Sequence, residues 1–199
     1  MPRYDADTLS FYQSYCPDYA AAGPDGVSRH LHSFIELLPT GARILDLGCG
    51  AGRDARAMLA AGFEVEATDA VPAMAQLAQA RLDRSVRVMR FDELDAHEEY
   101  DAVWASASLL HVPRAELPQV ISLVHRALKT DGVHCASYKA GKQEGRDSAG
   151  RYFNYLTRDG LMEAYHSAGD WHLKSLLEYE GGGYESGTGP WLAVTLQKR

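Results

Sequence analysis

The chain has 199 residues, of which 46% are hydrophobic and 24% are charged, so its composition is that of a folded domain rather than a disordered segment. A formal net charge of -7 argues against nonspecific binding to DNA or RNA, which usually needs a basic surface. No apolar run is long enough to span a membrane, and the first residues lack the apolar core of a signal peptide, so we expect a cytoplasmic protein without a membrane partner.

The first forty residues carry two helical patterns. One lies at about residues 8–20, and the second follows Asp25. A chain of this length fits a single domain, here residues 1–199. We expect residues 1–40 to form a helical cover on a core made by residues 41–199.

From residue 41 onward, short apolar strands alternate with helical patterns. Helices are predicted from about Arg53, from Pro72 and over residues 114–129. This alternation is typical of an α/β fold in which two helical layers enclose a parallel sheet, an αβα sandwich. The Gly-rich stretch at 181–190 would join the last two strands as a hairpin and place an antiparallel strand in a seven-stranded, mostly parallel sheet. The strands are expected at about 42–47, 63–68, 86–90, 101–105, 132–138, 171–179 and 191–197.

Residues 44–52, ILDLGCGAG, are the strongest functional signal in the chain. An apolar strand runs through Asp46 into glycines at 48, 50 and 52. Glycines adopt backbone conformations closed to other residues and let a ligand approach the peptide planes. The helix expected after them points its N-terminal amides at the same place. The segment therefore predicts a small-molecule site at the carboxyl end of the first strand.

The spacing of these glycines distinguishes two classes of cofactor. A dinucleotide fold would need G-x-G-x-x-G, with its third glycine at position 53, which is Arg53. The spacing G-x-G-x-G, preceded by an acid, resembles instead the signature of class I S-adenosyl-L-methionine (SAM) methyltransferases. SAM carries a sulfonium and an ammonium, and the carboxylate of Asp46 would favour both.

The second and third strands each end in an acid. Asp69, 21 residues after Gly48, is placed to accept both ribose hydroxyls of an adenosine cofactor. The resemblance implies that Asp92 accepts the adenine amino group. It assigns cofactor contacts to Asp46, Gly48, Gly50 and Gly52 with Arg53, to Asp69 with Ala70, to Asp92, and at the methyl end to Ala105 and Ser106.

The resemblance covers roughly residues 40–140 and implies a Rossmann-like sandwich with the strand order 3-2-1-4-5-7-6. Within the family, the chain looks like the small bacterial methyltransferases of the tellurite-resistance type. It departs from the usual Pro-Gly-Gly before the fifth strand, having Thr130-Asp131-Gly132, where Gly132 can still supply the turn. The motifs that carry the resemblance are ILDLGCGAGRDA, EATDAVPAM, FDELD, YDAVWASASLLHVP and LKTDGV, with RDARAMLAAGFEV and ASYKAG as cues to the subfamily.

Methyl transfer would take place where the fourth strand ends, at WASASLLHVP. His111 is the one titratable side chain there, so it is a candidate general base, although a histidine beside a helix start also serves as a cap or packing residue. The region lacks the Asn/Asp-Pro-Pro-Tyr/Phe tetrapeptide of nucleic-acid amino methyltransferases, which makes DNA amines poor candidate substrates.

Two segments are candidate covers for the site. Residues 139–158 hold five basic residues against two acidic ones, hence +3, and could draw an anionic substrate, form a lid, or be a solvated loop. At the N-terminus, Tyr12 or Tyr19 could touch SAM, because helices of related enzymes pack over the cofactor.

The cysteines and histidines give no sign of a metal site. The three cysteines form no Cys-x-x-Cys pair, and the eight histidines lack the spacing of ligands. We therefore expect neither disulfides nor bound metal.

The sequence thus predicts a monomeric or weakly dimeric SAM-dependent methyltransferase that acts on a small-molecule acceptor and leaves S-adenosyl-L-homocysteine. An anionic acceptor, as in the tellurite-resistance type, is one candidate; carboxylates, thiols, small amines and tellurite stay open. Two alternatives are a noncatalytic SAM-binding sensor or interaction protein and, less favoured because of Arg53, an NAD-dependent oxidoreductase.

Overall fold

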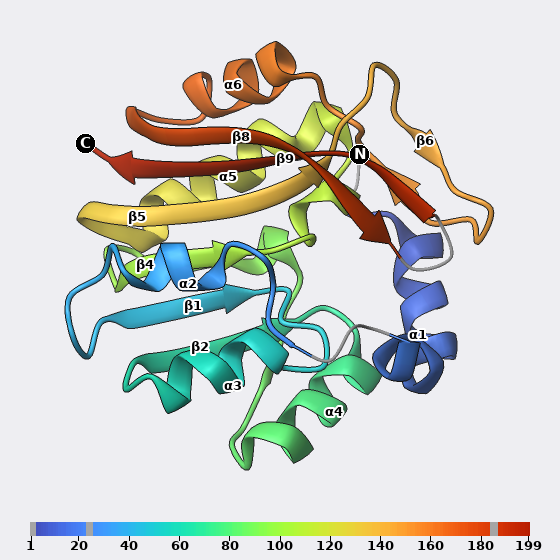
Figure 1. Ribbon diagram of the computed structural model, residues 1–199, viewed down its shortest axis with the longest axis horizontal. Helices are drawn as coiled ribbons and strands as arrows, with labels where there is room; N and C mark the ends of the chain where they lie inside the picture. The colour runs from blue at the N-terminus through green and yellow to red at the C-terminus, as the bar shows by residue number, and fades with distance from the viewer. Residues whose placement is uncertain (1–2, 23–25, 184–186) are drawn as a thin grey trace.

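A seven-stranded sheet forms the middle layer of the molecule (Figure 1). The computed structural model describes residues 3–22, 26–183 and 187–199. Five strands are parallel, and β9 lies antiparallel between β5 and β8, which confirms the predicted sheet with its antiparallel terminal hairpin. The order β3-β2-β1-β4-β5-β9-β8 is that implied by the family resemblance. The strands are β1 (Arg43–Leu47), β2 (Glu64–Asp69), β3 (Arg87–Val88), β4 (Tyr100–Ala105), β5 (Leu128–Lys139), β8 (Trp171–Gly183) and β9 (Gly187–Lys198).

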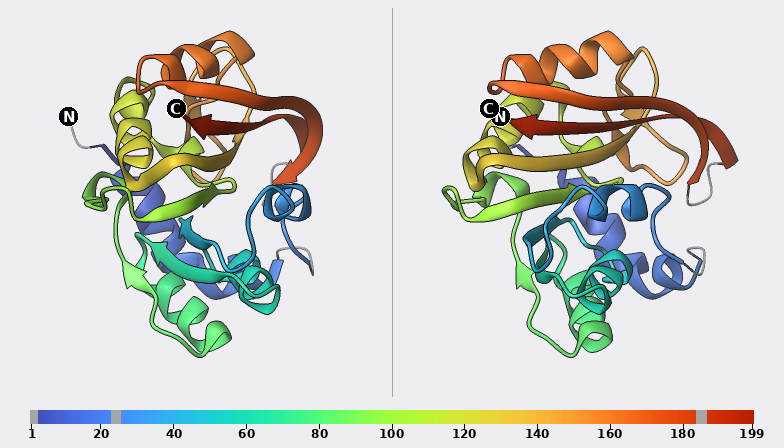
Figure 2. Two further views of the ribbon diagram at one scale, coloured as in Figure 1. Left: turned by 90° about the vertical axis from the view of Figure 1, so that its left-hand side faces the viewer. Right: turned by 60° about the vertical axis from the view of Figure 1, so that its left-hand side comes forward.

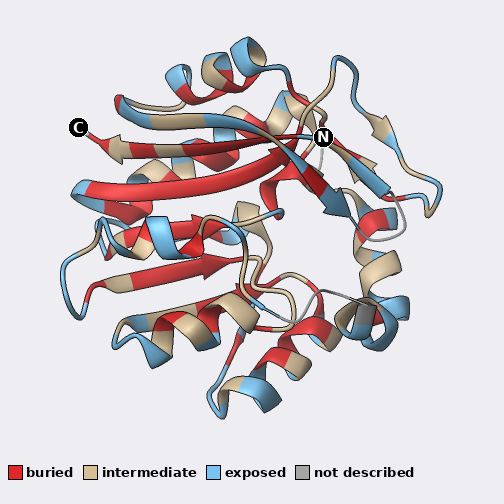
Figure 3. Cartoon of the chain, viewed as in Figure 1, coloured by how far each residue is buried: buried red, intermediate tan, exposed pale blue. Residues whose placement is uncertain are grey.

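Helices cover both faces of the sheet (Figure 2). Successive side chains of a strand point to opposite faces, so β1 sends Ile44 into one apolar cluster and Leu45 into another. Both are fully buried, and Figure 3 shows β1, β4 and most of β5 as buried, whereas β8 is mostly exposed or half-buried. The first face carries α2 (Leu31–Ile35), α3 (Arg53–Ala60) and α4 (Pro72–Leu82), and the second carries α5 (Leu117–Ala127) and α6 (Arg158–His166).

Two further elements stand at the carboxyl ends of the parallel strands (Figure 1). Helix α1 (Ala6–Ala22) packs on the start of α4, where Cys16 contacts Val71 and Met74. It is kinked at Tyr15, because Pro17 lacks an amide proton and its ring clashes with the preceding turn. A small hairpin, β6 (Gly145–Arg146) and β7 (Tyr152–Phe153), lies within the candidate lid. We call residues 141–156 the flap.

Several elements differ in length from the prediction. The third strand is only two residues long, and the chain then turns into the 3-10 helix Phe91–Glu93, where the Glu93 carboxylate accepts the amide of Arg90 at 2.8 Å and the Glu93 amide donates to the Arg90 carbonyl at 3.0 Å. The helix expected after Asp25 shrinks to the five residues of α2. The helix expected over 114–129 is a 3-10 turn followed by α5, and Leu128 is already the first residue of β5.

The Thr130-Asp131-Gly132 segment lies inside β5. Asp131 has a left-handed φ of 62°. A Cβ on Gly132 would lie 2.8 Å from the carbonyl oxygen of Lys129, so the glycine is required by space. Gly132, which the sequence analysis expected to supply the turn, is therefore also the residue that β5 requires at this position.

A buried hydrogen-bond chain joins β5 to α6. His134 bonds the carbonyl of Val103 through Nδ1 at 3.0 Å and the hydroxyl of Tyr165 through Nε2 at 2.9 Å. The Tyr165 hydroxyl also lies 3.0 Å from that of Tyr138. All three side chains are fully buried, and burial lowers the pKa of His134 from 6.5 to about 4, partly opposed by the Val103 carbonyl.

Replacing His134 by Gln should flatten the pH dependence of stability. The unfolded chain binds a proton at His134 near pH 6.5 and the folded chain only near pH 4, so this residue costs stability as the pH falls through that window. Between pH 7 and 4.5 the wild type should lose about 2 to 3 kcal/mol more than the variant, measured by urea unfolding. Asp69, whose pKa is raised, has the opposite effect and stabilises the folded chain as the pH falls. It does so equally in the wild type and the variant, so it cancels from the comparison. His97→Gln, at an exposed position, is the control and should keep the wild-type slope.

Candidate functional site

A cavity opens where the parallel strands end beneath α1. It has two adjoining lobes, with volumes of about 100 and 180 Å³. The aromatic lobe is lined by Tyr12, Phe91 and His111, among others, and the polar lobe by Asp46, Arg53, Asp54, Ser28 and Ser106, among others. Both lobes share Tyr19, Gly48, Gly50 and Ala107, so one extended ligand could occupy them together.

The glycine loop borders both lobes with bare backbone. The amides of Gly48 and Cys49 donate to the carbonyl of Thr68 at 2.9 and 2.8 Å, which ties the loop to the end of β2. Gly48 has a φ of 84°, and a Cβ there would lie 2.6 Å from the Cβ of Ser108. Gly50 has a φ of 54° and open space beside it. A side chain at either position would therefore distort the loop or enter the cavity.

Asp46 brings an unsatisfied carboxylate to the polar lobe. Its side chain is 2% exposed, and its Oδ2 atom is buried without a hydrogen-bond partner. Burial, followed by the nearby charges of Asp54 and Asp69, raises the pKa of Asp46 well above its ordinary value. A buried carboxylate beside other acids is stabilised by a bound cation, and the ammonium of SAM fits that requirement.

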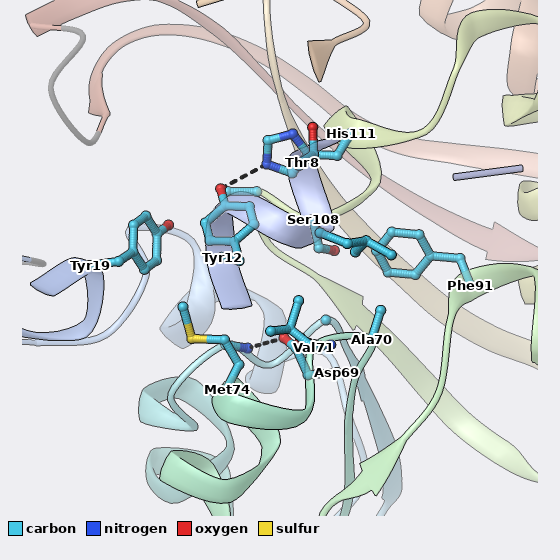
Figure 4. Close-up of a pocket in the computed structure, with 14 residues that line it drawn as sticks. Thr8, Tyr12, Tyr19, Asp69, Ala70, Val71, Met74, Phe91, Ser108 and His111 are labelled. Atoms are coloured by element: carbon cyan, nitrogen blue, oxygen red, sulfur yellow. Dashed lines mark hydrogen bonds between the residues drawn. The ribbon is translucent and has the colours of Figure 1, made fainter. Parts of the chain in front are cut away.

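Asp69 holds the glycine loop from the end of β2. Its Oδ1 accepts the amide of Val71 and its Oδ2 accepts the amide of Gly50, both at 2.9 Å. Burial raises the pKa of Asp69 to about 6, and the two backbone bonds oppose this. Each oxygen keeps a second lone pair for a ligand hydroxyl, and Asp69 lines the aromatic lobe (Figure 4).

His111 uses both ring nitrogens within the protein. Its Nε2 lies 2.9 Å from the hydroxyl of Tyr12, which points toward it in Figure 4, and its Nδ1 lies 2.6 Å from the carbonyl oxygen of Tyr152. Burial lowers the pKa of His111 to about 4; the Tyr152 carbonyl opposes this, and the positive charges of Arg151 and Lys139 reinforce it. The ring is therefore neutral near pH 7.

The structure gathers most of the residues singled out from the sequence at this cavity. Asp92 instead belongs to the 3-10 helix beside the aromatic lobe, where it pairs with Arg90 at 3.0 Å, while its neighbour Phe91 lines the lobe. Ala105 is fully buried at the end of β4, and Gly52 is buried as the N-cap of α3. The predicted residues that line a lobe are Tyr12, Tyr19, Asp46, Gly48, Gly50, Arg53, Asp69, Ala70, Ser106 and His111.

Sequence reasoning missed several lining residues. Thr8 and Leu9 precede Tyr12 by about one helical turn, and Met74 lies one turn into α4, so helical spacing could have indicated them. Asp54 could not be found this way. Its carboxylate accepts the indole N–H of Trp104 at 2.9 Å and the amide of Ser28 at 2.8 Å, contacts between distant segments.

The basic residues of the candidate lid are largely paired. Arg151 and Asp147 form a buried ion pair at 2.6 Å. Arg146 reaches Asp5 at 2.7 Å, and Arg158 reaches Glu178 at 3.7 Å. Two of the three excess positive charges counted along residues 139–158 are thus paired with acids outside the segment, Asp5 and Glu178.

Residues 3–22, 26–183 and 187–199 contain no group of three His, Cys, Asp or Glu side chains that could hold a metal ion. Within the same ranges, no helix has the length and apolar character needed to cross a bilayer.

Comparison with known proteins connects this geometry to a family. Residues 44–132 match a family model described as a methyltransferase domain. A ubiquinone biosynthesis O-methyltransferase of Xanthomonas axonopodis pv. citri is 32% identical over 129 residues, which are 54% of this chain and 54% of that protein. The chain spans about half the length of the curated relatives it matches.

Solved structures share the whole fold. The 1,6-didemethyltoxoflavin-N1-methyltransferase of Burkholderia thailandensis, solved with 1,6-didemethyltoxoflavin and S-adenosylhomocysteine, is 25% identical. It covers 97% of this chain and 88% of its own, with a TM-score of 0.75. A TehB-like SAM-dependent methyltransferase of Corynebacterium glutamicum is 21% identical, with coverages of 98% and 100% and a TM-score of 0.71, a likeness of fold. The sheet order, the glycine loop and these matches together support a methyltransferase domain of the class I SAM-dependent kind, with S-adenosyl-L-methionine as its cofactor, over residues 44–132.

Proposed function

We propose that this protein transfers the methyl group of SAM to a small-molecule acceptor. The observation that carries the proposal is the two-lobed cavity, in which the buried carboxylate of Asp46, with its Oδ2 unpartnered, lines one lobe and Asp69 lines the other. In the proposed arrangement, Asp46 and the glycine loop hold the methionyl part, and Asp69 holds the ribose. Bound SAM supplies an electrophilic methyl, and the protein has to align an acceptor with it.

The state of His111 limits the kinds of acceptor. A histidine with a pKa of about 4 is a weak base at pH 7, since general bases work best with a pKa near the working pH. Both of its nitrogens are also engaged. We therefore propose an acceptor that is ionised near neutral pH or is nucleophilic without a strong base.

With Asp69 and the glycine loop assigned to SAM, the opposite side of the aromatic lobe is left for the acceptor, and its lining favours a flat, mostly apolar molecule with one polar group (Figure 4). Rings of Tyr12, Tyr19 and Phe91 form its walls, and hydroxyl and imidazole groups supply the polar contacts. The Xanthomonas relative is named for ubiquinone biosynthesis, and the Burkholderia enzyme is solved with a heteroaromatic molecule. These names support the same class of acceptor for this chain.

A small anion such as tellurite is the second candidate acceptor. The positive charges of Lys139 and Arg151 both act on His111, so the potential at this wall of the cavity favours an anion. The pairing of Arg151 with Asp147 weakens that attraction. We rank the anion behind the flat acceptor for this reason.

The proposal includes three further predictions from the sequence. The protein acts in the cytoplasm as a monomer or weak homodimer, without a nucleic-acid partner. Residues 1–40 and 139–158 serve as covers of a core that begins at residue 41. Asp92 contacts the adenine after leaving Arg90, its partner in the structure.

A binding measurement and a methyl-transfer assay test the function directly. Calorimetry should give micromolar binding of SAM and S-adenosylhomocysteine and no binding of NADH. Incubation with labelled SAM and a panel of phenols, thiols, heteroaromatic amines and tellurite should then transfer label to one class. Tight SAM binding without transfer to any acceptor would favour the noncatalytic sensor, and binding of NADH alone would favour the oxidoreductase.

Replacing Asp69 by Ala should weaken SAM binding by about 2 kcal/mol, roughly 30-fold, because a charged hydrogen-bond acceptor is lost and the glycine loop loses its anchor. The measurement is calorimetric titration with SAM. Asp95→Ala removes an exposed carboxylate paired with Arg87 and is the matched control. Wild-type affinity in Asp69→Ala would rule out the ribose contact, and wild-type affinity in Asp92→Ala would rule out the adenine contact.

Titration of His111 should not change the turnover rate between pH 5.5 and 8. A group with a pKa of about 4 is already unprotonated throughout that range. His111→Gln should lower kcat and leave the affinity for SAM unchanged, since the ring contacts Tyr12 and the flap rather than the glycine loop. A loss of activity on acidification with an apparent pKa near 6.5, absent from the variant, would contradict this and restore His111 as an ordinary base.

A further inference from the structure

The hydroxyl of Tyr12 is the junction of a hydrogen-bond chain that links α1, the flap and the cavity. It lies 2.9 Å from Nε2 of His111 and 3.2 Å from Nη1 of Arg151. His111 continues the chain to the carbonyl oxygen of Tyr152, at 2.6 Å. Tyr12 and His111 line the aromatic lobe, whereas Arg151 lies behind them with 2% of its surface exposed.

The Tyr152 end of this chain fixes the proton of the His111 ring. A carbonyl oxygen can only accept, so Nδ1 carries the ring proton and Nε2 of the neutral ring is bare. A guanidinium can only donate, so the Tyr12 oxygen accepts from Arg151 and the Tyr12 proton is available to the bare Nε2, although the hydroxyl of Tyr19 is a further partner of Tyr12. The reverse order would set a bare Nδ1 against a carbonyl oxygen at 2.6 Å, two acceptors in contact.

Arg151 is itself held rigidly. Asp147 accepts its Nη2 at 2.6 Å and its Nε at 3.0 Å, a two-point pair between buried groups. The guanidinium also lies over the rings of Phe11 and Phe153, 5.0 and 5.4 Å from their centres. Held at these points, the guanidinium directs Nη1 to the Tyr12 hydroxyl at 3.2 Å.

We propose that Arg151 is a positioning residue of the site: it directs the Tyr12 proton to Nε2 of His111 and keeps the Tyr12 oxygen at the cavity wall, where a methyl acceptor meets it. His111 is then the group that orients Tyr12, and the acceptor contacts the Tyr12 oxygen rather than an imidazole nitrogen. That contact rests on the proposed function, whereas the order of protons does not.

The test is the tautomer of His111, which needs no knowledge of the acceptor. Protein labelled with ¹⁵N-histidine is examined by NMR at pH 7, free and with S-adenosylhomocysteine, and His111→Gln identifies the signals of this ring. The expected result is a bare Nε2 and a protonated Nδ1. The groups that face His111 from the elements around it are Tyr12, Arg151, Asp147, Tyr152 and Lys139.

Variants separate positioning from simple structural support. Tyr12→Phe deletes one oxygen and should move the Nε2 signal downfield, toward that of an unbonded ring nitrogen. Arg151→Met should move it in the same direction by less, and Arg151→Lys should fall between Arg151→Met and the wild type. Arg146→Ala, which removes the neighbouring bond of the flap to Asp5, is the matched control and should leave His111 unchanged.

Two results would overturn the proposal. One is a protonated Nε2 in the wild type, and the other is a wild-type His111 spectrum in both Arg151 variants. If Arg151→Met does not fold, Arg151→Lys and Tyr12→Phe decide. Absence of SAM binding and turnover would instead refute the proposed function, so the two failures are distinguishable.

Discussion

The carboxylate of Asp69 is the interaction on which the site depends. It bonds the amide of Gly50 on one side and the amide of Val71 on the other, so one buried group sets the glycine loop against the start of α4. These amides belong to two helix-entry turns, whose exposed N–H groups need acceptors. Asp69 satisfies both and still faces the cavity with its remaining lone pairs. Asp69 thus both holds these elements of the fold together and lines the cavity.

This arrangement places three acids close together. Burial raises the pKa of Asp46, the charges of Asp54 and Asp69 raise it further, and burial raises the pKa of Asp69 to about 6. In the free protein, ionisation of these carboxyls is therefore unfavourable at the place where the proposed arrangement puts the methionyl end of SAM. A ligand that brings an ammonium and a sulfonium makes their ionisation more favourable, so the same carboxyls contribute to cofactor selectivity.

The sequence predicted the sheet and the glycine loop because both follow from local pattern: apolar alternation, glycine spacing, and acids at strand ends. The strand order came from the family resemblance, since strand spacing does not determine order. The sequence overextended the third strand, where the Glu93 carboxylate accepts the amide of Arg90 and the chain turns. It could not predict contacts such as Arg151 with Tyr12, because 139 residues separate them and only the folded flap brings them together. Asp92 follows the third strand, where the resemblance implies an adenine contact, yet in the folded chain its carboxylate pairs with Arg90. Side-chain geometry determines that pairing.

The pairing of charged residues is likewise not predictable from the sequence. Counted along the chain, residues 139–158 carry an excess of positive charge and suggest a trap for anions. In the fold, Arg146 fastens the flap to Asp5 of the N-terminal segment, and Arg151 with Asp147 supports Tyr12. These cations hold two covers together instead of facing the cavity as a free positive surface. Selection among acceptors must then depend on the shape of the aromatic lobe and on the few polar atoms fixed in its wall, of which the Tyr12 oxygen is the most firmly placed.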